Sequence, residues 1–321
     1  MPVPVIAYDP GFGNTKVCVD GRVSTLQSAV SRPQSIGLAA IGMKTAGRNV
    51  PIVEFANQRL AVGPGSWNLG QPLTSLDYYS LVTPERLALF YAALSEVVPS
   101  DLQSVTLVIG LPVPLLQDKS QAELVLESVK QLKRVHEFSI GDSNFVFNIH
   151  AIKVLAQPVG AYIDWLYDDQ FNIRSGANKA EVAIIDIGLN TLDLYVVMGG
   201  QVSERHIGGA EVGVQRLLEL VAYEGRDLME ADATLRNGSL KIGSSHLDMW
   251  LGEILAAIKR TWSSFQRFTV VIPTGGGALV LGDRLKTTLA AKGAAIHWPT
   301  DPITANVCGF WKYGARYVSG H

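Results

Sequence analysis

Two short stretches combine a carboxylate, glycines and polar side chains in a pattern that could bind phosphate and a metal ion. The first is Asp9-Pro10-Gly11-Phe12-Gly13-Asn14-Thr15-Lys16, and the apolar runs on both sides predict a strand, a tight turn and a second strand. Its glycines would let main-chain N–H groups approach an anion, Lys16 would add positive charge, and Asp9 could hold a hydrated cation. The spacing matches neither a P-loop nor a Rossmann fingerprint. An ordinary hairpin with an exposed lysine would look the same, so this stretch alone is weak evidence.

The second stretch, Asp186-Ile187-Gly188-Leu189-Asn190-Thr191-Leu192-Asp193, repeats this build. Asp9 aligns with Asp186 and Gly11 with Gly188, and Asn14-Thr15 align with Asn190-Thr191 if Gly13 is counted as one additional residue. In each half a second strand, a glycine turn and a third strand follow, the third strand of the second half covering 201–206. We therefore expect two related domains, each presenting a phosphate-binding hairpin to one ligand between them.

Bulk properties restrict the class of protein. A length of 321 residues favours two domains, and 47% hydrophobic residues can form a large core. A net charge of −2 and a pI near 6.3 give no basis for direct nucleic-acid binding. The two cysteines, Cys18 and Cys308, fit a reducing cytoplasm. We find no signal peptide and no apolar run of membrane-spanning length, so we expect a cytoplasmic protein without a membrane partner.

The elements that must position these stretches can be predicted from periodicity and capping. Thr83-Pro84 predicts the start of a helix that packs on a sheet. The region 27–82 is irregular and predicts a small insertion with short strands, and 225–246 predicts a polar excursion. The other expected elements are strands at 105–109, 136–140, 145–154 and 269–272, and helices at 117–134, 161–167, 247–262, 279–291 and 306–318.

Three further groups could take part in chemistry. Gly275-Gly276-Gly277, between a strand and a helix, could contact an anion or nucleotide, with a plain loop as the alternative. Asp9 and Asp186 could hold Mg²⁺ through water, although an aspartate also commonly caps a turn. Gln157 lies near the domain junction. It can align water but cannot take up a proton, which favours hydrolysis over transfer to a hydroxyl. The alternative for Gln157 is that it caps the helix that follows.

These motifs resemble those of the actin and sugar-kinase superfamily, and most of all those of ParM/StbA-type and archaeal actin-like proteins. Asp9-x-Gly11-x-Gly13-x-x-Lys16 resembles the first phosphate motif and Asp186-x-Gly188-x-x-Thr191-x-Asp193 the second. Gly275-Gly276-Gly277 resembles the adenosine motif. Gln157-Pro158-x-Gly160-Ala161 and the stretch 306–313, with Gly309, resemble the two connecting helices.

The resemblance implies an α/β, actin-like (ribonuclease H-like) fold of two related domains around a nucleotide cleft. Residues 1–156 would form domain I, with the insertion at about 27–82 and closed by a C-terminal helix at 305–321, and residues 157–304 would form domain II. ATP and Mg²⁺ would lie in the cleft. Gln157 and Asp186 would be catalytic, and Asp9 and Asp186 would hold the metal through water. The nucleotide-binding residues would be Gly11, Gly13, Asn14, Thr15, Lys16, Gly188, Asn190, Thr191, Gly275, Gly276 and Gly277.

The resemblance also implies an ATPase, with GTP as a further substrate to consider, that polymerises into filaments and so has itself as partner. The region 27–82 offers an apolar group for self-association: Trp67, Leu69, Leu73, Leu76, Tyr78 and Tyr79. Plasmid segregation, the best-known role in the group, would add a DNA-bound adaptor protein, which no residue here indicates. ParM-type proteins often carry Glu at the position of Gln157, whereas actin carries Gln. The alternatives are a small-molecule kinase of the same superfamily and a non-polymerising nucleotide-binding scaffold.

Overall fold

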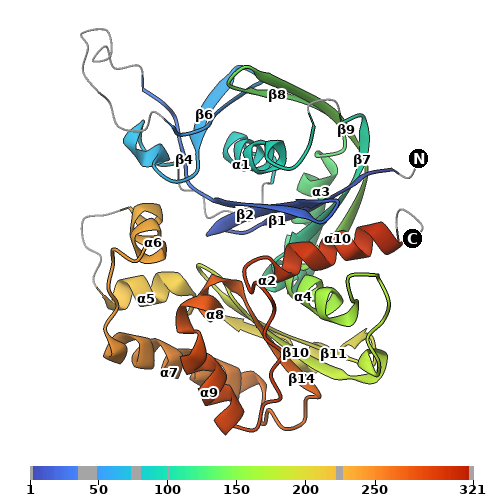
Figure 1. Cartoon of the computed structure of the whole chain (residues 1–321), viewed down its shortest axis with the longest axis vertical. Helices are drawn as coiled ribbons and strands as arrows, with labels where there is room; N and C mark the ends of the chain where they lie inside the picture. The colour runs from blue at the N-terminus through green and yellow to red at the C-terminus, as the bar shows by residue number, and fades with distance from the viewer. Residues whose placement is uncertain (1–2, 35–48, 74–80, 100–101, 222–226, 318–321) are drawn as a thin grey trace.

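The chain forms two α/β domains, one above the other in Figure 1. The computed structural model describes residues 3–34, 49–73, 81–99, 102–221 and 227–317. Two helices, α4 (Gln157–Leu166) and α10 (Ala305–Tyr317), lie between the two sheets. None of the helices in these ranges is long and apolar enough to cross a membrane. The α/β architecture of two domains that the resemblance implied is therefore present.

The sheet of domain I curls around a buried helix. In the described residues it has nine strands in the order β3-β2-β1-β7-β9-β8-β5-β6-β4, and Figure 1 shows them surrounding α1 (Pro84–Ser95). Thr83 caps α1 by accepting a hydrogen bond from Arg86 N, as predicted. The strands are β1 (Val5–Pro10), β2 (Asn14–Val19), β3 (Arg22–Gln27), β4 (Val30–Ser31), β5 (Ile52–Phe55), β6 (Gln58–Val62), β7 (Ser104–Leu111), β8 (Val135–Ile140) and β9 (Ser143–Ala156).

The region 27–82 is more closely integrated into domain I than we expected. Its strands β4, β5 and β6 continue the main sheet beyond β8 instead of forming a separate insertion. Val53 and Leu60 are completely buried against α1, which explains why these strands belong to the domain core. The predicted apolar group for self-association lies partly outside the described residues, because Leu76, Tyr78 and Tyr79 fall in 74–80.

Domain II is built on a smaller sheet. Its described strands follow the order β12-β11-β10-β14, with β13 also paired to β11. The expected third strand at 201–206 is shorter, because a 3-10 helix occupies Glu204–His206 after β12. The strands are β10 (Glu181–Ile187), β11 (Leu192–Met198), β12 (Gln201–Val202), β13 (Gly208–Ala210) and β14 (Val270–Thr274). The helices are α5 (Val214–Leu220), α6 (Leu228–Arg236), α7 (Ser244–Thr261), α8 (Gly275–Leu281) and α9 (Asp283–Ala291).

Several predicted helix boundaries were wrong. The helix expected at 117–134 is two helices, α2 (Val113–Gln117) and α3 (Lys119–Lys130), because Asp118 takes an extended conformation and caps α3. The helix expected at 279–291 begins four residues earlier and is broken at Gly282, whose φ is +50°. The polar excursion expected at 225–246 contains a true helix, α6, which begins at the cap Asp227.

The two connecting helices cross with almost no space between their backbones. A Cβ atom on Gly309 of α10 would lie 1.8 Å from the carbonyl oxygen of Gly160 on α4. A Cβ atom on Gly160 would lie 2.2 Å from the carbonyl oxygen of Asn306. Helix α10 also packs on β1, β2 and β7 of domain I. Glycine at both positions therefore allows the close crossing that joins the two domains.

Candidate functional site

The two predicted hairpins are equivalent in their strand register. Asp9 pairs with Lys16 across β1 and β2, and Asp186 pairs with Asp193 across β10 and β11. Both separations are seven residues, so the structure aligns the hairpins without the additional residue that we had assigned to Gly13. Asp193 is therefore the counterpart of Lys16, and the side chain opposite the first aspartate of the hairpin changes from cationic to acidic between the domains.

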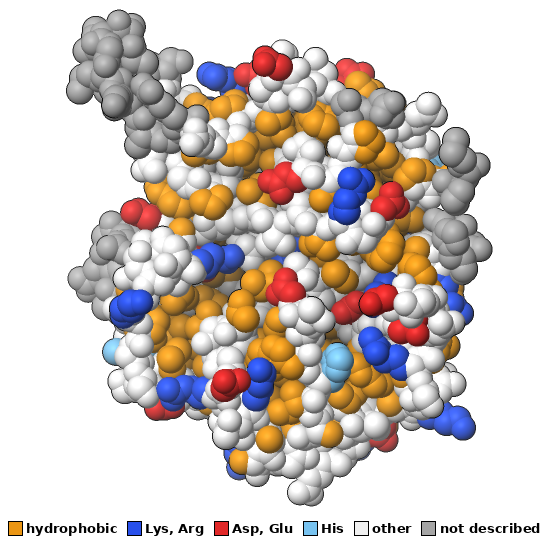
Figure 2. Space-filling view, viewed as in Figure 1, with side chains coloured by type: hydrophobic (Ala, Val, Ile, Leu, Met, Phe, Trp, Pro, Cys, Tyr) orange, Lys and Arg blue, Asp and Glu red, His pale blue; other side chains and the backbone are white. Residues whose placement is uncertain are grey.

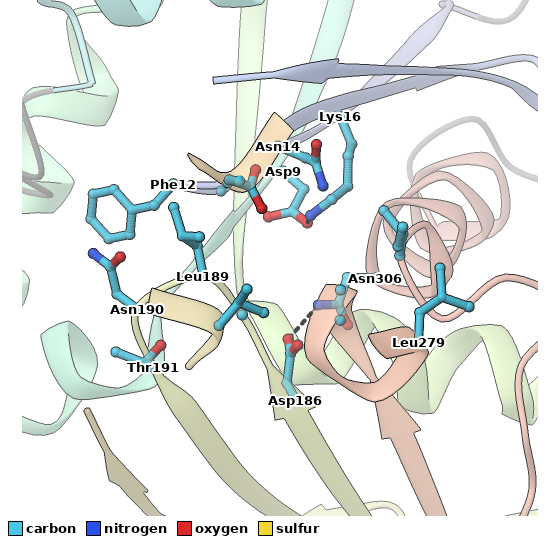
Figure 3. A pocket seen from close by; sticks show the side chains of 18 of the residues that line it. Asp9, Phe12, Asn14, Lys16, Asp186, Leu189, Asn190, Thr191, Leu279 and Asn306 are labelled. Carbon is cyan, nitrogen blue, oxygen red and sulfur yellow. Dashed lines mark hydrogen bonds and ion pairs between the residues drawn. The ribbon is translucent and has the colours of Figure 1, made fainter. Parts of the chain in front are cut away.

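Both hairpins face one cavity of about 470 Å³ between the domains, a size typical of small-molecule sites. Figure 3 shows Asp9, Asn14 and Lys16 on one side of it and Asp186, Leu189, Asn190 and Thr191 on the other. Most of the predicted site residues line this cavity: Asp9, Gly11, Gly13, Asn14, Lys16, Gln157, Asp186, Gly188, Asn190, Thr191, Gly275 and Gly276.

Two predicted residues do not line the cavity. Thr15 is fully buried, and its Oγ1 lies 3.1 Å from Ser28 Oγ in a hydrogen bond on the other side of the hairpin. Gly277 faces β10, where a Cβ atom would lie 2.3 Å from Ile187 Cγ2. Alternation along β2 explains Thr15, because neighbouring residues of a strand point to opposite faces.

Gly188 and Gly275 leave space at the cavity, but their backbone N–H groups already donate hydrogen bonds within the protein. The N–H of Gly188 donates to Thr191 O at 2.8 Å, and the N–H of Gly275 donates to Pro302 O at 2.8 Å. Gly275 has a φ of +84°, and a Cβ atom there would lie 2.6 Å from Asp186 Oδ1. These two glycines therefore close turns and leave room beside Asp186.

Asp9 is the centre of a hydrogen-bond group that links the hairpin of domain I to α4. Lys16 Nζ donates to Asp9 Oδ2 and Gln157 Nε2 donates to Asp9 Oδ1, both at 2.7 Å. Gln157 is the first residue of α4, and Ala156 occupies the cap position without a side-chain hydrogen bond. Gln157 therefore does not cap the helix, and the carbonyl oxygen of its side chain is the atom able to accept a hydrogen bond from water.

Asp186 is held by a residue that we had not assigned to the site. Asn306 Nδ2 donates to Asp186 Oδ2 at 2.7 Å, as Figure 3 shows, and Asn306 Oδ1 accepts from Ala161 N at 3.2 Å. Burial raises the pKa of Asp186, and the nearby Lys16 and the hydrogen bond from Asn306 oppose this rise. One side chain of α10 thus connects the second hairpin with the backbone of α4.

Asp193, quoted in the sequence motif but given no role, is also in the cavity lining. Thr191 Oγ1 donates to Asp193 Oδ2 at 3.0 Å, whereas Asp193 Oδ1 is buried without a hydrogen-bond partner. Burial, together with the nearby Asp186, raises the pKa of Asp193 to about 7. The equal seven-residue spacing of Asp9 to Lys16 and of Asp186 to Asp193 was the signal that could have identified this residue.

A third wall of the cavity comes from α6, in the stretch that we expected to be a polar excursion. Asp232, Leu235 and Arg236 line the cavity from this helix. The cap Asp227, followed by apolar residues at 228, 229, 231 and 235, was the signal that could have predicted it.

The charges of the cavity suit a polyanion only in the presence of a cation. Four carboxylates line it, Asp9, Asp186, Asp193 and Asp232, against two cationic side chains, Lys16 and Arg236. Within the described residues no group of three or more His, Cys, Asp or Glu side chains could enclose a metal ion. The unpartnered Oδ1 of Asp193 and the carboxylate of Asp186 nevertheless fit a hydrated Mg²⁺ ion, which keeps several of its waters.

On the molecular face shown in Figure 2, acidic and basic side chains are interspersed.

Comparisons with known proteins agree with this geometry. Residues 7–160 match the family model described as actin like proteins, N-terminal domain. The archaeal actin homologue Ta0583 is 20% identical with a TM-score of 0.74, covering 98% of this chain and 100% of that one. The ParM of a 15-stranded filament from Clostridium botulinum is 18% identical with a TM-score of 0.73, covering 99% and 100%. The apo psk41 ParM protein is 16% identical with a TM-score of 0.73, covering 98% of each chain.

A structure of Ta0583 in complex with ADP also matches this chain. Its identity is 19% and its TM-score 0.69, and the match covers 97% of this chain and 99% of that one. A search of curated protein sequences finds no match. Identities this low establish the fold, and the family model covers the first domain. The first domain therefore matches the actin-like protein family, and the chain as a whole has the two-domain fold shared by ParM and archaeal actin homologues.

Proposed function

We propose that the cavity binds a nucleoside triphosphate, ATP in the first place, together with Mg²⁺. The observation that carries this proposal is that two hairpins of equal register face each other across one cavity, each with a buried aspartate at the same position. Lys16 would attract phosphate, while the excess of carboxylates would require a divalent cation alongside it. The apolar lining, which includes Leu235, Leu279 and Ile303, suits a base or ribose. The ADP complex of Ta0583 supports the same ligand class.

We further propose that the protein hydrolyses this nucleotide. Bound Mg²⁺ would neutralise charge on the phosphates. Gln157, held by Asp9 through its Nε2, presents its Oε1 for orienting a water molecule. A glutamine cannot remove a proton from a sugar hydroxyl, which disfavours the kinase alternative.

The assembled form that we propose is a filament of this chain. Two proteins with this fold, the ParM of Clostridium botulinum and Alp12, are described as filaments. The fold does not by itself require polymerisation, so assembly needs a test of its own.

The test of nucleotide binding is a titration of the purified protein with ATP, with and without Mg²⁺, by calorimetry. Asp186→Asn keeps an acceptor for Asn306 and removes the charge, so we expect it to lose most of the Mg²⁺-dependent part of the affinity. Loss of one charge-assisted contact corresponds to roughly tenfold or more in Kd. Asp142→Asn is the matched control, because Asp142 is exposed in the turn between β8 and β9.

The test of hydrolysis uses Gln157→Met, which keeps the length of the side chain and removes its hydrogen bonds. We expect ATP affinity close to wild type and phosphate release slower by roughly one to three powers of ten. Hydrolysis at the wild-type rate in this variant would remove Gln157 from the mechanism.

Equal ATP affinity of wild type and Asp186→Asn at every Mg²⁺ concentration would contradict the proposed metal site.

A further inference from the structure

The two domains are joined on a second side, away from the connecting helices. Figure 1 shows α6 at the left of the boundary between the two domains and α10 at its right. Arg236 of α6 donates through Nη1 to Asn14 Oδ1 at 2.6 Å, in the hairpin of domain I. Gln27, at the end of β3, donates through Nε2 to Met229 O at 2.7 Å and to Asp232 Oδ2 at 3.0 Å. These hydrogen bonds join residues more than 200 positions apart, from domain I to domain II.

The polar residues of this contact form one connected group. Asp232 Oδ2 accepts from Gln27 and also from Arg236 Nε, the latter at 2.6 Å. Arg236 is thereby held between a carboxylate of its own helix and the hairpin of the other domain. Gln27 and Asp232 are 5% and 2% exposed, so their hydrogen bonds are shielded from water and would be costly to leave unpaired. We call Asn14, Gln27, Asp232 and Arg236 the interdomain clasp.

Apolar packing supports the clasp. Phe12, at the tip of the domain I hairpin, and Ala29 are buried in the hydrophobic core of domain II, beside Leu189 and Met229. Arg86 of α1 lies over the Phe12 ring, with 5.0 Å between the guanidinium carbon and the ring centroid, and donates to Pro10 O at 3.2 Å. The hairpin tip is therefore fixed on the domain I side while its phenyl ring is inserted into domain II.

We propose that the interdomain clasp holds the two phosphate hairpins at their working separation before any ligand binds, and that it slows release of the ligand. Asn14, Asp232 and Arg236 line the cavity, so the clasp fixes the width of the site itself. A site that is already closed loses less free energy to rearrangement on binding, and its ligand must wait for the clasp to open. This inference deepens the proposed nucleotide function and rests on it for the identity of the ligand.

Gln27 allows a test that does not touch the binding surface, because it is not part of the cavity lining. Gln27→Leu removes both donated hydrogen bonds at similar volume, and Gln27→Glu places a carboxylate against that of Asp232. Gln201→Glu is the matched control, since Gln201 is exposed on β12. Melting temperatures of all four proteins establish that each variant is folded.

The first measurement is hydrogen–deuterium exchange of the nucleotide-free protein. We expect the amides of 228–236 to exchange about tenfold faster in both Gln27 variants, because two hydrogen bonds are lost. The second is release of Mg²⁺-bound methylanthraniloyl-ATP, chased with unlabelled ATP. We expect release about tenfold faster in both variants, and wild-type behaviour of Gln201→Glu in both measurements.

The outcomes separate this inference from the function on which it rests. Unchanged exchange in the Gln27 variants would overturn the clasp, and faster exchange with unchanged release would overturn its role in retaining the ligand. If the wild-type protein binds no labelled ATP, the proposed nucleotide function fails and the retention role fails with it. Faster exchange of α6 would then still support the clasp as the device that joins the two domains.

Discussion

Asp193 is the residue whose charge state most directly connects the cavity to pH. Its pKa is raised from 3.8 to about 7 by burial and by the neighbouring Asp186. Between these two values the folded protein keeps a proton that the unfolded chain has released. The contribution of Asp193 to stability is therefore complete below pH 3.8 and is lost as the pH rises through about 7.

We expect Asp193→Asn to remove this dependence, because the amide keeps the shape and cannot titrate. Relative to this variant, the free energy of unfolding of the wild type should fall by up to about 4 kcal/mol between about pH 4 and about pH 8. Urea denaturation of both proteins across this range measures the difference, and titrating groups that do not interact with Asp193 cancel in the comparison. Parallel curves for the two proteins would show that Asp193 does not titrate in this range.

The sequence predicts the contacts of a site residue well when its partners are near in the chain. Asp9 and Lys16 are seven residues apart on one hairpin, so their meeting follows from the turn alone. Asn306 and Asp186 are 120 residues apart, and Arg236 and Asn14 are 222 apart. Such contacts depend on how the domains pack, which periodicity and capping do not specify.

The crossing of α4 and α10 is the element-scale feature on which the site depends most. Asp9, Asp186 and the backbone of α4 are connected through Gln157 and Asn306 at this crossing. Since a Cβ atom on Gly309 would lie 1.8 Å from Gly160 O, any side chain there must push the helices apart.

We expect Gly309→Ala to lower the free energy of unfolding by roughly 1–3 kcal/mol, the usual effect of overfilling a packed interface. Gly252→Ala on α7 is the control, because a Cβ atom there meets nothing within 4 Å. It should raise stability by about 0.5–1 kcal/mol through helix propensity. Urea denaturation measures both, and a stabilised Gly309→Ala protein would show that the helices can separate without cost.

Helices and strands that begin at a clear capping residue or show a regular apolar pattern were predicted. Strands whose place depends on pairing with a strand far away in the sequence were not. Thr83-Pro84 marked the start of α1, and the two hairpins were marked by their glycines. Strands β4, β5 and β6 were assigned to an insertion, because nothing local shows that β5 pairs with β8. Helix α6 was missed because its polar composition masked a helical stripe that packs on domain II.

For the whole molecule, the two domains are joined at the helix crossing and at the interdomain clasp, so their relative position is set from both sides of one cavity. A filament repeats one contact between identical subunits, and every subunit must therefore present the same relation between its domains. A ligand in the cavity would contact both hairpins and would therefore reinforce the relation that the crossing and the clasp set.

We accordingly expect wild-type protein with Mg²⁺ and ATP to sediment above a critical concentration, and Asp186→Asn to remain in the supernatant. Gln157→Met should assemble and stay assembled longer than wild type, because it binds ATP but hydrolyses it slowly and hydrolysis would mark subunits for release. Sedimentation and light scattering over time, with Asp142→Asn as control, measure both effects. Monomeric wild-type protein over a wide concentration range, with ATP shown to be bound, would favour the non-polymerising scaffold over the filament.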